Sequence, residues 1–264
     1  MASTDKRILL GAMLAAAAGI AAPAHAGTLV GLVDGKGLVT IDTDTRKVTR
    51  SVTIGGVPGL VGIDVRPADG MVYGLTADGW VVTLDPATGK ATPKVKLKTM
   101  LPAEVAATVD FNPVADRLRV MGSDGTNLRA NVDDGAVTTD GMLKFADGDM
   151  HKGEKANIVA GAYTNSYKGT KETALYDLDA TIGGLIKQAP PNDGVLNAVG
   201  KLGVALSGPL AFDIASDGMG GNTGWLVAGW TLHKVDLATG KATAVGRIEG
   251  GGGNVMDIAA LPAM

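Results

Sequence analysis

A short hydrophobic strand pattern with an embedded aspartate recurs along the chain. In each copy a small or apolar residue precedes the aspartate and more apolar residues follow it, as in Gly62-Ile63-Asp64-Val65. A weaker copy at 160–165 has Tyr163 where the aspartate would stand. The full copies centre on Asp64, Asp110, Asp213 and Asp257, and with Tyr163 included the successive spacings are 46, 53, 50 and 44 residues. A period of about 40–50 residues is typical of a structural unit that is repeated and packed against its neighbours.

A second repeated signal falls late in the units. Residues 83–92 read TLDPATGKAT and residues 234–243 read KVDLATGKAT, with a looser copy at 40–49. The aspartate can bond to the backbone two residues on, and the glycine supplies a left-handed turn residue, so each copy predicts a tight hairpin. The best helical candidate, Asp177 to Ile186, contains Gly183-Gly184, which argues against a long helix. The pattern therefore predicts an all-β chain.

The first and last units are each incomplete. Thr28 to Ile54 lacks a preceding aspartate strand, whereas Val255 to Ala259 is an aspartate strand with nothing after it. Pairing the two fragments completes one unit and removes two open sheet edges. We therefore predict a small β-propeller of five four-stranded antiparallel blades, closed by pairing of the N- and C-terminal strands and forming one domain over residues 27–264.

The first 26 residues have the features of a signal peptide. Lys6 and Arg7 form a basic start, Ile8 to Ala22 is a short apolar run, and Ala24-His25-Ala26 matches a cleavage site. Cleavage after Ala26 would leave 238 residues and no stable membrane span. We expect a periplasmic or secreted protein; the alternative is a retained N-terminal anchor.

Composition excludes several classes of function. The formal net charge is −3, which does not favour a nucleic-acid partner. The chain has no cysteine, so thiol catalysis and thiolate metal sites are excluded. Hydrophobic residues make up 45% of the sequence, enough for a real core without disulfides. We expect a monomer.

The repeated aspartates are the first candidate site. If their strand is the innermost one of each blade, Asp64, Asp110, Asp213 and Asp257 surround the central channel, where carboxylates could hold Ca²⁺ or another divalent cation. The alternative, which we favour, is that each carboxylate bonds to the backbone of a neighbouring blade, because buried carboxylates are normally hydrogen-bonded. On that basis no cofactor is expected.

The second candidate is a polar strand pair. Arg117 and Arg119 share one strand face, since they are two residues apart. With Arg129, they could bind a carboxylate or phosphate group of a ligand, and Asn112 and Asn127 would contribute amide groups. The alternative is that these arginines pair with Asp116, Asp110 or Asp133.

The same stretch carries a family resemblance. Residues 109–120 (VDFNPVADRLRV) and 127–131 (NLRAN), with 61–67 (VGIDVRP) and 190–194 (PPNDG), resemble the exported bacterial family known as domain of unknown function 4394. The resemblance covers nearly all of the chain after residue 26. It implies a propeller-like all-β domain and no particular reaction or substrate.

Two functions from different classes remain open. The first is a non-enzymatic propeller that binds a ligand or protein partner in the cell envelope or outside the cell. The second is a metal-dependent hydrolase, lactonase-like or phosphoesterase-like, with an Asp-lined channel. No G-x-S-x-G or H-E-x-x-H motif favours catalysis.

Overall fold

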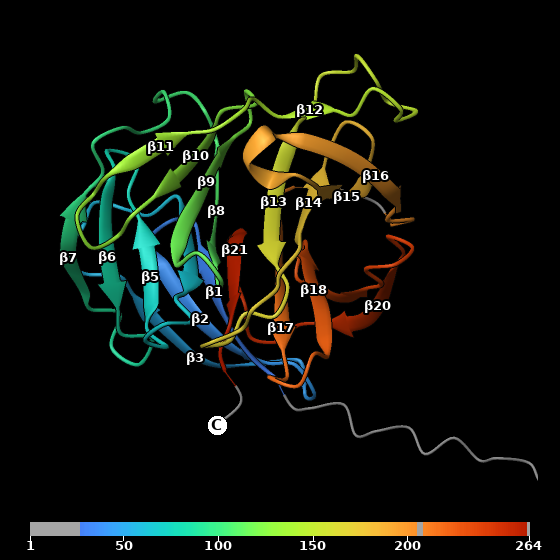
Figure 1. Cartoon of the computed structure of the whole chain (residues 1–264). Helices are drawn as coiled ribbons and strands as arrows, with labels where there is room; N and C mark the ends of the chain where they lie inside the picture. The colour runs from blue at the N-terminus through green and yellow to red at the C-terminus, as the bar shows by residue number, and fades with distance from the viewer. Residues whose placement is uncertain (1–26, 205–207, 263–264) are drawn as a thin grey trace, which may run out of the picture.

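Five sheets are arranged around a common axis, with the first strand of four sheets and the last strand of the chain nearest the centre (Figure 1). The structure is a computed structural model that describes residues 27–204 and 208–262. The predicted signal peptide, residues 1–26, lies outside the described residues. The prediction of a five-bladed β-propeller is confirmed.

Blade 1 is built from both ends of the chain. From the axis outward it contains β21 (Val255–Ala260), β1 (Thr28–Val33), β2 (Gly37–Asp42) and β3 (Lys47–Thr53). The β1 and β21 strands pair antiparallel, with Leu29 opposite Ala260 and a register shift between Leu32 and Val33. The predicted closure by the terminal strands is therefore confirmed.

Three further blades have the expected four antiparallel strands. Blade 2 contains β4 (Gly62–Val65), β5 (Val72–Leu75), β6 (Trp80–Leu84) and β7 (Ala91–Lys96). Blade 3 contains β8 (Ala107–Asn112), β9 (Arg117–Gly122), β10 (Asn127–Ala130) and β11 (Val137–Thr139). Blade 5 contains β17 (Leu210–Ser216), β18 (Asn222–Ala228), β19 (Thr231–Val235) and β20 (Ala242–Arg247).

Blade 4 departs from the prediction. It contains β13 (Ile158–Tyr163), β14 (Leu175–Asp179), β15 (Gly184–Gln188), β16 (Val195–Lys201) and a fifth strand, β12 (Lys144–Phe145). The β12 strand pairs parallel to β16, so this blade is neither four-stranded nor purely antiparallel. Its parallel pairing is possible because residues 146–194, a long stretch of chain, separate β12 from β16.

The segment considered for a helix, 177–186, is instead the β14–β15 hairpin. Gly183 has a φ of +59° and serves its turn. Among the described residues the helical structure is one 3₁₀ turn, η1 (Pro191–Asp193).

The core is divided among the blade interfaces. Five clusters of buried hydrophobic residues each combine side chains of two neighbouring blades, such as Leu32 with Ile63 and Phe111 with Tyr73. The rings of Tyr73 and Phe111 meet edge-on with centroids 5.3 Å apart. Burial between blades therefore holds the ring together and fixes the innermost strands around the channel.

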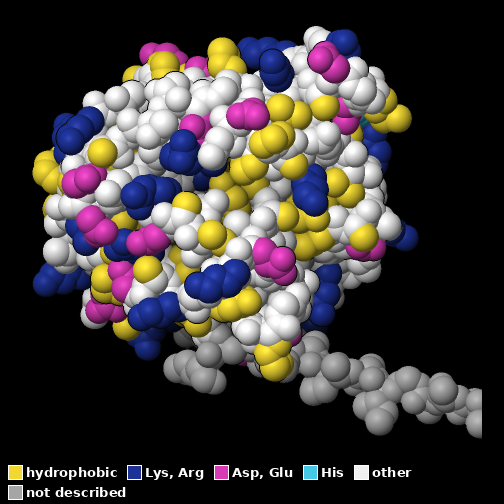
Figure 2. Space-filling model, in the orientation of Figure 1, with side chains coloured by type: hydrophobic (Ala, Val, Ile, Leu, Met, Phe, Trp, Pro, Cys, Tyr) yellow, Lys and Arg dark blue, Asp and Glu magenta, His cyan; other side chains and the backbone are white. Residues whose placement is uncertain are grey.

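The surface in the view of Figure 1 mixes both charges. Figure 2 shows Lys and Arg interspersed with Asp and Glu over this face, with hydrophobic side chains gathered toward its middle. Within the described residues, no helix has the length and apolar character needed to cross a membrane.

Candidate functional site

The innermost strands contact one another in the cyclic order β21, β4, β8, β13, β17. Three of the repeated aspartates occupy one level of this ring. Asp64 lies opposite Tyr73 in its blade, Asp110 opposite Arg119, and Asp213 opposite Trp225. All three side chains are at most 5% exposed. The repeat therefore places three carboxylates together in the channel, as the sequence predicts.

At this level each innermost strand donates one backbone N–H to the carboxylate ring. The five donors are the amides of Val65, Phe111, Tyr163, Ile214 and Ala260. Asp64 and Asp213 accept two amides each, at N–O distances of 2.6 Å, and Asp110 accepts one at 3.0 Å. In each case one carboxylate oxygen reaches the next blade, so the aspartates connect neighbouring blades.

This pattern corrects the interpretation of Tyr163. The amide that Asp64 accepts from the next blade follows Asp110, and the amide that Asp110 accepts follows Ala162. The residue equivalent to the aspartates in blade 4 is therefore Ala162, which lies opposite Tyr176. Tyr163 is one position further on, so its side chain leaves the strand on the other face.

Asp257 is also displaced from the expected position. Asp213 accepts the amide of Ala260, which makes Ala259 the equivalent residue in blade 1. Asp257 lies two residues earlier on the same strand face, about 6.7 Å along the strand. Its carboxylate accepts the amides of Ile63 at 2.9 Å and Ile258 at 3.0 Å. Asp257 thus links blades 1 and 2 at a separate level of the channel.

Burial raises the pKa of all four channel carboxyls. The pKa of Asp213 rises to about 6 because the group is desolvated, although its two amide hydrogen bonds oppose the shift. Desolvation also raises the pKa of Asp64, Asp110 and Asp257 well above the ordinary value, and the neighbouring carboxylate charges add to this. Among the described residues, no Lys, Arg or His forms an ion pair with any of them.

One oxygen from each of Asp64, Asp110 and Asp213 lies within 4.8 Å of the other two. Asp257 is not part of this group, which follows from its position at the other level. We call Asp64, Asp110 and Asp213 the carboxylate triad. The triad brings three acidic groups together at a spacing that one cation could bridge.

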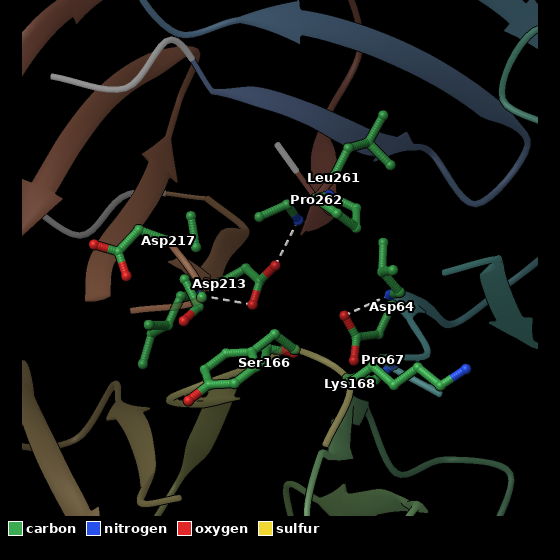
Figure 3. A pocket seen from close by; sticks show the side chains of 15 residues that line it. Asp64, Pro67, Ser166, Lys168, Asp213, Asp217, Leu261 and Pro262 are labelled. Carbon is green, nitrogen blue, oxygen red and sulfur yellow. Dashed lines mark hydrogen bonds between the residues drawn. The ribbon is translucent and has the colours of Figure 1, made fainter. Parts of the chain in front are cut away.

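A pocket of about 250 Å³ opens where the innermost strands end. Asp64 and Asp213 line it from blades 2 and 5, and Figure 3 shows their carboxylates facing it from the two sides. Apolar walls come from Val65, Pro67, Ile214, Ala215, Leu261 and Pro262. The loop after β13 adds Ser166, Tyr167 and Lys168, which the sequence patterns did not single out.

The predicted arginine site is a buried network between blades 3 and 4. Arg119 is 1% exposed and donates to the Tyr163 hydroxyl at 3.1 Å, Asn127 at 2.8 Å and Asp140 at 2.6 Å. It also donates to Asn192 at 2.8 Å. These contacts join β9 to β13 and to the η1 turn, and they occupy the guanidinium of Arg119.

Arg129 binds both oxygens of the same Asp140, at 2.6 and 2.9 Å. Arg117 points elsewhere and donates to the carbonyl oxygens of Ala115 and Asp116. Asn112 caps the following turn by accepting the amides of Val114 and Ala115. The structure thus brings Arg119, Arg129 and Asn127 together, places the Asn112 side chain against Tyr163 and leaves Arg117 outside the group.

The expected partners of these arginines were wrong. Asp116 and Asp133 instead bind Arg66, at 2.6 and 2.8 Å. Asp110 instead accepts the backbone amide of Tyr163 at the channel. Asp140, after β11, is the partner of both Arg119 and Arg129.

A further carboxylate is buried near this network. Asp177 of β14 is fully buried, and neither of its oxygens accepts a hydrogen bond. The side-chain oxygen of Gln188 is likewise unpaired. Desolvation raises the pKa of Asp177 well above the ordinary value, while the charge of Arg119 acts in the opposite direction.

Several solved structures are similar to this chain at low sequence identity. A protein of unknown function from Bacteroides thetaiotaomicron is 17% identical with a TM-score of 0.54, covering 92% of this chain and 66% of its own. A protein of unknown function from Bacteroides caccae is 16% identical with a TM-score of 0.45, covering 85% and 73%. An auxiliary nutrient binding protein from Bacteroides thetaiotaomicron is 13% identical with a TM-score of 0.47, covering 84% and 57%.

A comparison with curated proteins finds none that matches this chain. The model of one sequence family, described as a domain of unknown function (DUF4394), matches residues 37–259. This match spans all five blades, and the chain therefore belongs to the DUF4394 family.

Proposed function

We propose that this protein is a non-enzymatic binding propeller that takes a small, positively charged ligand in the pocket at the end of the channel. The supporting observation is the pairing of an accessible pocket with buried carboxylates that have no positive partner among the described residues. Buried charges are normally paired, so a cationic group of a ligand would supply what the site lacks. The apolar walls would contact the rest of the ligand.

The hydrolase alternative gains no comparable support. The two histidines after residue 26, His151 and His233, do not line the pocket. His151 contacts Glu154 at 3.1 Å, and the ring of His233 contacts the carbonyl of Thr231. Binding is therefore the function that we propose.

Ligand-observed NMR with benzylamine tests this proposal on the EDTA-treated protein. Benzylamine carries the positive group on an apolar body of suitable size, whereas benzyl alcohol and benzoate have the same shape without that charge. We expect saturable binding of benzylamine alone. Ala215→Trp, which fills the pocket, should weaken it at least tenfold, whereas Ala87→Trp in an exposed turn should leave it unchanged.

Equal binding of all three compounds, or full binding by Ala215→Trp, would contradict the proposal.

We also propose that the protein acts in the periplasm or outside the cell, on the strength of Lys6-Arg7 and Ala24-His25-Ala26. N-terminal sequencing of the exported form should give Gly27; an intact chain found only in the membrane fraction would argue for the retained anchor.

A further inference from the structure

We propose that the carboxylate triad binds one divalent cation of the Ca²⁺ type, with the remaining coordination positions facing the pocket. This rests on the proposed function, because it names the positive group that the same site would take. The triad has members in blades 2, 3 and 5, so the ion would connect blade 5 to blades 2 and 3 across the channel.

The spacing of the triad fits a single ion. Ca²⁺ binds oxygen at about 2.3–2.6 Å, so two oxygens on opposite sides of one ion lie up to about 5 Å apart. One oxygen of each triad residue falls within 4.8 Å of the other two. Ca²⁺ also tolerates irregular geometry and takes about 6–8 oxygens, which leaves positions for water or for oxygens of a second ligand.

One of the carboxylate oxygens of the triad accepts no backbone amide. The three carboxylates have six oxygens, and the five amides of the ring use five of them. The sixth belongs to Asp110, which is 4% exposed and accepts only the amide of Tyr163. This oxygen is not one of the fully buried unpaired atoms, so it keeps access to the channel space, where an ion could bind it.

The amides also hold the triad in place. Because each carboxylate is tied to a strand backbone, it would need little reorganisation to bind an ion. The equivalent residues of the other two blades are Ala162 and Ala259, which bring neither a further charge nor a bulky side chain into the ring. The pocket lined by Asp64 and Asp213 gives an ion access from solvent.

Calorimetry of the EDTA-treated full chain with CaCl₂ tests the site, with the stoichiometry checked by equilibrium dialysis and elemental analysis. We expect one ion per chain and a higher melting temperature in Ca²⁺. Asp110→Asn should weaken binding at least tenfold, yet it keeps an oxygen for the Tyr163 amide. Asp257→Asn is the matched control, since Asp257 is a partly buried channel carboxylate outside the triad. The Ca²⁺ affinity of this variant should differ from that of the wild type by less than threefold.

A second measurement does not depend on any variant. The melting temperature of the EDTA-treated chain should rise on addition of CaCl₂ and return on addition of excess EDTA, because an ion that binds the folded chain stabilises it by mass action. No reversible rise in melting temperature, no stoichiometric binding of Ca²⁺, Mg²⁺ or Mn²⁺ at 5 mM, or equal losses in Asp110→Asn and Asp257→Asn would overturn the proposal. Benzylamine binding that survives such a result would leave the proposed function standing without the metal.

Discussion

Carboxylates are buried in two regions of this propeller, and the two regions treat them differently. In the channel, Asp64, Asp110, Asp213 and Asp257 together accept seven backbone amides. Between blades 3 and 4, Asp177 is buried as deeply and accepts none. Aspartates that are withdrawn from solvent therefore join blades in one region and have unsatisfied acceptors in the other.

The local backbone explains the contrast. The channel carboxylates lie against strands that present backbone N–H groups at the ring, so the same position that withdraws them from solvent also gives them hydrogen-bond donors. Asp177 lies opposite Gly161, where a Cβ would be only 2.4 Å from its Oδ1. Its positive neighbour Arg119 already donates to Tyr163, Asn127, Asp140 and Asn192. A buried carboxylate is thus stabilising only where the fold also supplies donors.

The largest expected effect comes from removing a channel carboxylate. Asp64→Ala leaves the amides of Val65 and Phe111 without an acceptor, at roughly 1–3 kcal/mol each, so the free energy of unfolding should fall by about 2–6 kcal/mol. Asp110→Ala leaves one such amide, Tyr163, and should cost about half as much. Urea unfolding measures the free energy of unfolding of both variants. Equal decreases would mean that the carboxylates do not act chiefly as acceptors for these amides.

The next largest effect is expected in the dependence of the free energy of unfolding on pH. Burial raises the pKa of Asp213 from 3.8 to about 6, so the folded chain keeps a proton that the unfolded chain releases in this range. The protonated Asp213 carboxyl therefore contributes its full share to the free energy of unfolding below about pH 4, and this share is lost as the pH rises through 6. At 1.36 kcal/mol per pKa unit the loss is about 3 kcal/mol for this group alone.

Chemical unfolding of the EDTA-treated chain at a series of pH values measures this loss. Asp213→Asn should flatten the profile between pH 4 and 7, because it removes the titrating group. The exposed carboxyl of Asp133, whose pKa is lowered chiefly by a hydrogen bond from Arg66, changes stability only below this window. A wild-type stability that rises from pH 4 to 7 would contradict the assignment.

The smallest effect is expected at Asp177, and its sign is opposite to that of Asp64→Ala. Asp177→Asn removes the cost of ionising a carboxyl that lacks donors, so it should raise the free energy of unfolding at pH 8 by about 1–2 kcal/mol. The gain should shrink as the pH falls through 4 and vanish well below it, where the carboxyl is protonated in both the folded and the unfolded chain. A destabilised Asp177→Asn at pH 8 would show that the carboxylate has a partner in solution.

Much of the fold could be predicted because its signals are local and repeated. The aspartate strands and the Asp-x-Ala-Thr-Gly turns give the five units, and the two half-units at the ends give the closure of β1 with β21. The β12 strand could not be predicted in this way, since two residues pairing in parallel with β16 leave no periodic pattern.

The triad was only partly predictable. The equivalent positions Asp64 and Asp110 are 46 residues apart, as are Asp213 and Ala259, whereas Asp257 follows Asp213 by 44. That shorter spacing was the signal that Asp257 lies two residues early. The equivalence of Ala162 had no such signal, because an alanine inside an apolar strand looks like any core residue. The pairing of Arg119 with Asp140 depends on a contact across the blade that strand patterns do not encode.

The closure of blade 1 has a consequence for the order of events during synthesis. The innermost strand of the first blade, β21, is synthesised after the other strands of the propeller, and it carries Asp257 and the Ala260 amide that Asp213 accepts. Until residues 255–260 have been synthesised, β1 has no inner neighbour and the interface between blades 5 and 1 lacks its central strand. Folding therefore cannot be completed blade by blade from the N-terminus, and the nascent chain must keep an open sheet edge until its final strand arrives.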